Sequence, residues 1–206
     1  FPFRAKHASS FLAVLLIGVF LFLYSPTMNI AAGTMNVSTD GVVTVNASDI
    51  NAASAKIVNN GTITVTRESD IAANISGTGM LYLNSATLSS KTQITGAAAL
   101  VRAASGNTVI DGANLNVDLF NVGAGGKING SSTFTKDENV DRVNGVTVTL
   151  KNTTLKAGGS AYDGWIGTEY NLNNAITDAR YTLNAEKSDV NFGYLHVSTD
   201  GILNVT

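Results

Sequence analysis

The sequence predicts an all-β chain, a right-handed parallel β-helix with coils of about 18–20 residues, on three observations. Short runs alternate apolar residues with Thr, as in "TITV" at residues 62–65 and "VTVT" at residues 146–149. A Gly precedes such runs at nearly regular spacing, and no Pro occurs after residue 33. An antiparallel β-sandwich made from the same short strands is the alternative fold.

The first residues differ in kind from the rest. Arg4, Lys6 and His7 precede an uncharged apolar stretch at residues 11–24, and the small residues of 31–33 follow. This order is typical of a secretory signal peptide. Fourteen helical residues rise only about 21 Å, less than the roughly 30 Å of a bilayer core. We expect residues 1–32 to be a signal peptide, with a membrane anchor or a retained assembly helix as alternatives, and residues 33–206 to form the solenoid.

One short phrase occurs twice, as "VSTDGVVTV" at residues 37–45 and "VSTDGILNV" at residues 197–205, with six identical positions. Looser versions occupy residues 57–65, 75–83 and 122–130. The separation of 160 residues predicts two equivalent segments eight coils apart, at a distance of about 38 Å. Each occurrence of the pattern contains one glycine: Gly41, Gly61, Gly79, Gly126 and Gly201. Weaker matches contain Gly145 and Gly164.

Alternation places apolar side chains on one face of each strand, and stacking successive coils buries that face. We therefore expect the anchoring glycines to occupy equivalent turns. The apolar residues two and four positions later should face inward: Val43, Val45, Ile63, Val65, Leu81, Leu83, Leu203 and Val205. Residues 134–145 gather five charges and are predicted to form a projecting loop. An uncapped last coil exposes unpaired backbone, so we expect the chain to continue, a partner to cover this end, or self-association.

The Gly-apolar repeat and the composition resemble bacterial surface β-solenoids, namely autotransporter passenger domains and filamentous adhesins. The resemblance covers residues 33–206. It implies a secreted or cell-surface protein whose role is structural or adhesive.

The composition limits the kinds of ligand and catalytic site that this chain can have. Charged residues make up 14% of the chain and the net charge is −2, which gives no electrostatic basis for binding nucleic acid. The absence of Cys excludes disulfides and thiol chemistry. The sites weighed for a polysaccharide-degrading enzyme are carboxylates, some beside an Arg: Asp111, Asp118, Asp137, Glu138, Asp141 and Arg142. We interpret these as solvated or structural, His196 as an outward-facing residue without a metal partner, and the seven Asn-x-Ser/Thr sequons as products of composition. No catalytic residue, metal site or cofactor is predicted.

Aromatic residues are concentrated near the C-terminus, where six of the nine that follow residue 33 lie beyond residue 160. Aromatic rings stack on sugars, so we predict a glycan-contact strip made of Tyr162, Trp165, Tyr170, Tyr181 and Tyr194. The alternative is that these rings, with Phe192, pack the core of larger C-terminal coils. The predicted function is a non-enzymatic β-solenoid that presents loops and aromatic patches to glycan or protein partners. A fragment of a β-helical polysaccharide-degrading enzyme and a filament subunit are the alternatives.

Overall fold

The computed structural model describes residues 27–30, 32–46, 49–67, 71–94, 100–123, 127–128, 131–132, 140–141, 143–158, 163–168 and 179–206. Every regular element in these ranges is a β-strand, which confirms the predicted all-β class. Within the same ranges no helix has the length and apolar character needed to cross a membrane. Most of the expected signal segment, residues 1–26, lies outside the described residues.

The strands form three faces, called sheets A, B and C. Sheet A consists of β1 (Thr27–Asn29), β2 (Thr34–Val37), β4 (Asp49–Asn59), β6 (Ile71–Ser76), β9 (Gln93–Ile94), β11 (Asn114–Val117), β16 (Thr154–Ala157) and β19 (Asp189–Phe192). Sheet B consists of β3 (Val42–Asn46), β5 (Thr62–Thr66), β7 (Met80–Asn84), the first half of β10 (Leu100–Asp111), β12 (Leu119–Gly123), β17 (Gly164–Gly167) and β20 (Leu195–Val197). Sheet C consists of β8 (Thr87–Leu88), the second half of β10, β15 (Val146–Lys151), β18 (Tyr181–Glu186) and β21 (Gly201–Val205).

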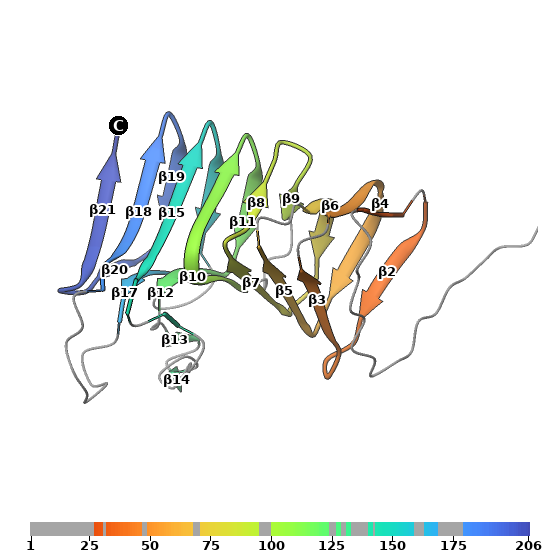
Figure 1. The fold of residues 1–206 in the computed structure, drawn as a ribbon, viewed down its shortest axis with the longest axis horizontal. Coiled ribbons are helices and arrows are strands. Elements are labelled where there is room, and N and C mark those ends of the chain that lie inside the picture. Colours follow the sequence, from red (N-terminus) through yellow and green to blue (C-terminus); the bar gives the residue numbers. More distant parts are fainter. Residues whose placement is uncertain are drawn as a thin grey trace, which may run out of the picture.

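The described strands pair in parallel, except for the short antiparallel hairpin of β13 (Lys127–Ile128) and β14 (Ser131–Ser132). The sandwich alternative is therefore wrong. The C-terminal half of the chain visits sheets A, B and C in turn, so each circuit stacks on the one before. Figure 1 shows the strands side by side along the long axis, in sequence order from red to blue. This arrangement is that of a stacked β-solenoid.

Ladders of apolar side chains fill the interior. In sheet A one ladder pairs the same position in seven successive strands: Met35, Ile57, Ile75, Ile94, Leu115, Leu155 and Val190. The five middle members are at most 2% exposed. Full burial of such a side chain contributes about 1.5–3 kcal/mol, so stacking is the main source of stability.

The inward pairs predicted from the glycine repeat are confirmed in the first coils. Val45, Ile63, Val65, Leu81 and Leu83 are at most 2% exposed, and Val43 packs against the core while partly buried. The prediction is wrong for the last pair, since Leu203 is 37% and Val205 is 72% exposed. Both align with buried residues of β18, but no described strand lies beyond β21 to cover them.

Three of the anchoring glycines occupy equivalent turns, as expected. Gly41, Gly61 and Gly79 precede β3, β5 and β7, where the chain passes from sheet A to sheet B. A Cβ atom on Gly61 would lie 2.2 Å from the Ser38 carbonyl oxygen and 2.3 Å from that of Gly41. Only Gly fits so close an approach of two backbones. Gly126 lies outside the described residues.

The two copies of the repeated phrase form the same local turn but lie at different corners of the coil. Gly41 N donates to Ser38 O at 2.8 Å, and Gly201 N donates to Ser198 O at 2.9 Å, so both copies form the same local turn. The first copy joins sheet A to sheet B, whereas the second joins sheet B to sheet C. The two segments are not equivalent, so the predictions of equivalent glycines throughout, eight steps and 38 Å are wrong.

Two long connections explain why the sequence spacing overestimates the number of coils between the two copies. Residues 124–145 follow β12 and residues 168–180 follow β17, so only six coil steps separate β3 from β20. Both connections leave sheet B at the corner where it meets sheet C. The charged loop predicted at residues 134–145 falls in the first connection, with 134–139 and 142 outside the described residues.

Candidate functional site

One column on the outer face of sheet B consists of two threonines followed by five planar side chains. Register places seven residues at the same outward position in successive strands: Thr44, Thr64, Tyr82, Arg102, Asn121, Trp165 and His196. They alternate with the inward core residues of the same strands, which fixes their direction. Arg102, Asn121 and Trp165 are nevertheless at most 5% exposed, so this outer face is covered over its middle strands.

The column ends in a stacked ring pair. The ring centroids of Trp165 and His196 lie 4.0 Å apart with 27° between their planes. Trp165 is 5% exposed, whereas His196 is partly exposed. The buried indole ring of Trp165 therefore fixes the orientation of the His196 imidazole, which stacks against it.

A second outward pair lies beside this column, two residues before Trp165 and His196 and just ahead of β17 and β20. The pair is Asp163 and Tyr194, and Tyr194 N donates to Asp163 Oδ2 at 3.1 Å. Asp163 is 4% exposed and Tyr194 is 49% exposed. A Cβ atom on Gly193 would lie 2.3 Å from the same carboxylate oxygen, so Gly193 leaves the room that Asp163 occupies. Asp163, Trp165, Tyr194 and His196 are called the sheet-B patch.

A further carboxylate borders this patch. Asp118 lies at the turn between β11 and β12, and burial together with the charge of Asp163 raises the pKa of its carboxyl group. Two neighbouring carboxylates beside the half-exposed Tyr194 suit hydrogen bonding to hydroxyl groups, and carboxylate pairs also perform acid–base chemistry in glycosidases.

The other carboxylates considered from the sequence lie elsewhere or outside the described residues. Asp111 Oδ1 accepts a hydrogen bond from Asn152 Nδ2 at 3.2 Å at the edge of sheet C. The Asp141 carboxylate accepts hydrogen bonds from the backbone N–H groups of Val143 and Asn144 at 2.9 and 2.8 Å, which lowers its pKa. That geometry is a turn, so Asp141 has a structural role. Asp137, Glu138 and Arg142 lie outside the described residues.

The predicted glycan-contact residues separate into three groups. Tyr162 and Tyr170 lie outside the described residues. Tyr181 is 1% exposed within the core, and its hydroxyl donates to Asp141 O at 3.1 Å, as the core-packing alternative expects. Trp165 is buried and stacked against His196, so of the three described members Tyr194 is the one with an accessible face.

Sequence reasoning missed the roles of Asp163 and His196. The outward positions of "DGW" at 163–165 and "YLH" at 194–196 are spaced by two residues and recur in neighbouring strands. This spacing could have indicated that the two pairs lie on one face. It could not show that the two strands are neighbours, because 31 residues separate Asp163 from Tyr194.

Among the described residues no three His, Cys, Asp or Glu side chains are grouped as a metal site would require. Comparison with known proteins gives no match to any family model, to any curated protein or to any solved structure. Fold and surface geometry are therefore the basis for a functional assignment.

Proposed function

We propose that the chain is a non-enzymatic, secreted or cell-surface β-solenoid that binds neutral glycans through the sheet-B patch. The observation that carries this proposal is the half-exposed Tyr194 beside His196, which is held in place by stacking on the buried Trp165. The stacked coils supply a rigid support that does not need to move when a ligand binds.

The chemistry of the patch suits a sugar ring. The face of Tyr194 offers an apolar surface to sugar C–H groups, and its hydroxyl offers a polar contact. The ring nitrogens of His196 add hydrogen-bonding capacity. The adjacent carboxylates disfavour anionic polysaccharides, because like charges repel across a surface of low charge density.

Two finer assignments belong to the same proposal. Right-handed coiling is supported by the strong preference of parallel crossovers for that hand. Export is supported by the order of basic, apolar and small residues in the first 33 positions, which is that of a signal peptide.

Affinity electrophoresis of the full chain through gels containing neutral polysaccharides tests the proposal. Tyr194→Ala should weaken binding about 2- to 13-fold, as expected for losing a stacking contact of about 0.5–1.5 kcal/mol. Tyr194→Phe should retain most of the binding, because it keeps the ring. Asn191→Ala, at an exposed position in β19 of the same coil, is the matched control. No retardation by any neutral polysaccharide, or equal binding by Tyr194→Ala, would overturn the proposal.

The Asp118–Asp163 proximity favours one alternative, a polysaccharide-cleaving enzyme. Release of new reducing ends or unsaturated products from a polysaccharide, abolished in Asp118→Asn while binding persists, would establish that alternative. Binding without product release leaves the non-enzymatic function in place.

A further inference from the structure

Two Asn-Gly pairs lie in the described part of the chain, and their surroundings differ. They are Asn60–Gly61 and Asn144–Gly145, while a third pair at residues 129–130 lies outside the described residues. In such a pair the backbone nitrogen of Gly can attack the side-chain amide carbon of Asn, because Gly has no side chain to hinder the approach. Whether a folded protein reacts in this way depends on how firmly the two groups are held.

The pair Asn60–Gly61 is held by the coils on both sides of it. Asn60 N donates to Val37 O at 2.9 Å, and Asn60 Oδ1 accepts hydrogen bonds from Thr78 N and Thr78 Oγ1 at 3.2 and 3.3 Å. The nitrogen that would attack is also engaged, since Gly61 N donates to Asn59 Oδ1 at 3.2 Å. Reaction here requires these bonds to break and stacked turns to separate, so the fold protects Asn60.

The side chain of Asn144, in contrast, is exposed and is held by a residue of its own turn. Asn144 N and Nδ2 donate to Asp141 Oδ1 and Oδ2 at 2.8 and 3.1 Å, and both hydrogen bonds lie at the surface. A surface turn of this kind opens locally at low cost, without separating the coils. Asn144 therefore reaches a reactive geometry more readily than Asn60 does.

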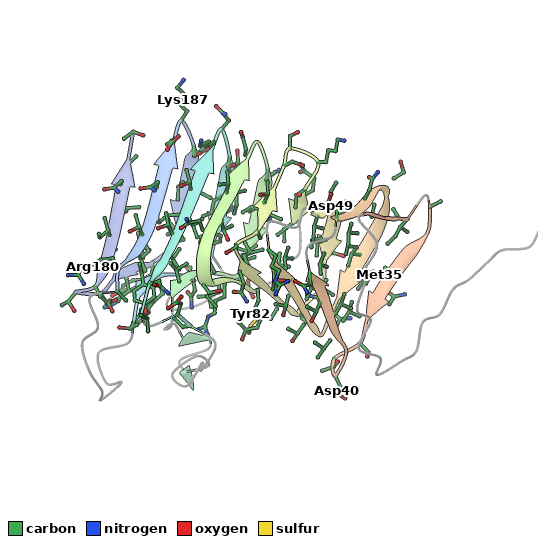
Figure 2. All side chains as sticks on the ribbon, in the orientation of Figure 1. Met35, Asp40, Asp49, Tyr82, Arg180 and Lys187 are labelled. Carbon is green, nitrogen blue, oxygen red and sulfur yellow. The ribbon has the colours of Figure 1, made fainter. Side chains whose placement is uncertain are left out.

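The fold itself requires the glycine that follows Asn144. Gly145 has a φ of 75°, and a Cβ atom on it would lie 2.0 Å from the backbone oxygen of Arg180. Figure 2 shows Arg180 at the corner of the stack where β18 begins. Because only Gly fits at this corner, the nitrogen next to Asn144 remains unhindered.

We propose that Asn144 is a site of spontaneous covalent modification, with Gly145 as the attacking group and water as the second reactant. A bond forms between Gly145 N and Asn144 Cγ, and the bond between Cγ and Nδ2 breaks. Ammonia leaves with the proton that Gly145 N loses, and a succinimide ring remains. Water then opens the ring at one of its two carbonyl carbons, which gives aspartate or isoaspartate at position 144.

The product destabilises the turn in which it forms. A carboxylate replaces the Nδ2 donor beside the Asp141 carboxylate, so repulsion between like charges replaces a hydrogen bond. Isoaspartate also adds one carbon atom to the main chain directly before β15. Asp141 O accepts a hydrogen bond from the hydroxyl group of the buried Tyr181 at 3.1 Å, so a displaced turn disturbs the core. Stability should therefore fall as the modification accumulates.

Peptide mapping of the full chain after incubation in mildly alkaline buffer tests the proposal. Trypsin releases residues 143–151 and 57–67 as separate peptides, so the two pairs are measured independently. In the folded protein Asn144 should convert about tenfold faster than Asn60 or more, and isoaspartate should accompany aspartate. In urea the two rates should become similar. Equal rates in the folded protein, no isoaspartate at position 144, or an unchanged difference in urea would overturn the proposal.

Two variants test the restraint and the consequence. Asp141→Ala removes both bonds that hold Asn144, so it should accelerate conversion there and leave the rate at Asn60 unchanged. Asp189→Ala, at an exposed carboxylate in β19, is the matched control and should change neither rate. Asn144→Gln disfavours ring closure, so it should keep its melting temperature on incubation while wild type loses it. An unaltered Asn144 rate in Asp141→Ala, or equal losses in wild type and Asn144→Gln, would contradict this account.

Discussion

At the scale of single residues, the local environment sets the pKa of each carboxyl group. Asp118 and Asp141 are both carboxylates in turns, yet their pKa values move in opposite directions. Burial and the neighbouring Asp163 disfavour ionised Asp118, whereas N–H donors stabilise ionised Asp141. In the sequence Asp118 stands between Val117 and Leu119, and Asp141 between Val140 and Arg142, and neither setting shows which groups approach the carboxylate after folding. The difference depends on Asp163, which is 45 positions from Asp118 and near it only after folding.

Asp118→Asn should raise the melting temperature at neutral pH, because it removes an ionised group that the folded state disfavours. The folded pKa lies above the ordinary value, so the wild-type penalty is present above the folded pKa. It fades as the pH falls through that value and the carboxyl group becomes neutral. Melting curves from pH 7 to pH 4 measure the gap between the two proteins. A gap that widens toward low pH would contradict this account.

Asp141→Ala should show the opposite pH dependence. The folded pKa of Asp141 is lowered, so its stabilising effect is present above the ordinary pKa of about 3.9 and is lost as the pH falls through the folded pKa. The variant should therefore melt at a lower temperature than wild type at pH 7. The deficit should shrink in acid, and a deficit independent of pH would rule out the charged contribution.

At the scale of strands and turns, the sequence predicts local structure well. Alternation in "TITV" and "VTVT" predicted β5 and β15, and the buried positions follow the apolar residues. Glycine spacing predicted the shared turn of Gly41, Gly61 and Gly79. The face to which a turn leads could not be predicted, because residues 38–41 and 198–201 form the same turn at different corners.

Gly61→Ala should destabilise the fold by about 1–3 kcal/mol, the typical cost of overpacking a close contact. The added methyl would lie 2.2 and 2.3 Å from two backbone oxygens, which are not free to move as side chains are. Gly158→Ala is the matched control, since no atom lies within 4 Å of its Cβ position. Urea denaturation gives both values. Equal stability of the two variants would show that the turns do not stack as described.

Leu155→Ala removes a fully buried member of the sheet A ladder and should cost about 2–5 kcal/mol. The neighbouring Thr154 points outward and is exposed, so Thr154→Ala should change stability by no more than about 0.5 kcal/mol. Urea denaturation separates the two effects. A small loss for Leu155→Ala would indicate that the ladder is not the core.

At the scale of the whole molecule, the sequence predicted coils stacked along one axis with parallel strand pairing, because each strand has one apolar face to bury. The number of coils did not follow, because connections of 22 and 13 residues, 124–145 and 168–180, add chain without adding strands to the stack. For the same reason the sheet-B patch joins residues that sequence spacing separates. The sequence indicated Trp165 and Tyr194 through composition alone, and only the register of β17 with β20 brings them to one place.

The distance between exposed positions in one column of sheet A tests the stacked arrangement most directly. Register aligns Thr34, Lys56, Asn74, Gln93, Asn114, Thr154 and Asp189 in adjacent strands. Spin-label pairs that combine Asp189→Cys with Cys at position 74, 56 or 34 should give about 19, 24 and 29 Å, a constant step of about 4.8 Å per coil. The measurement uses wild-type protein as diluent, so that distances within one chain dominate. Distances that follow sequence separation, or that fail to increase by one regular step per coil, would contradict the stacked solenoid.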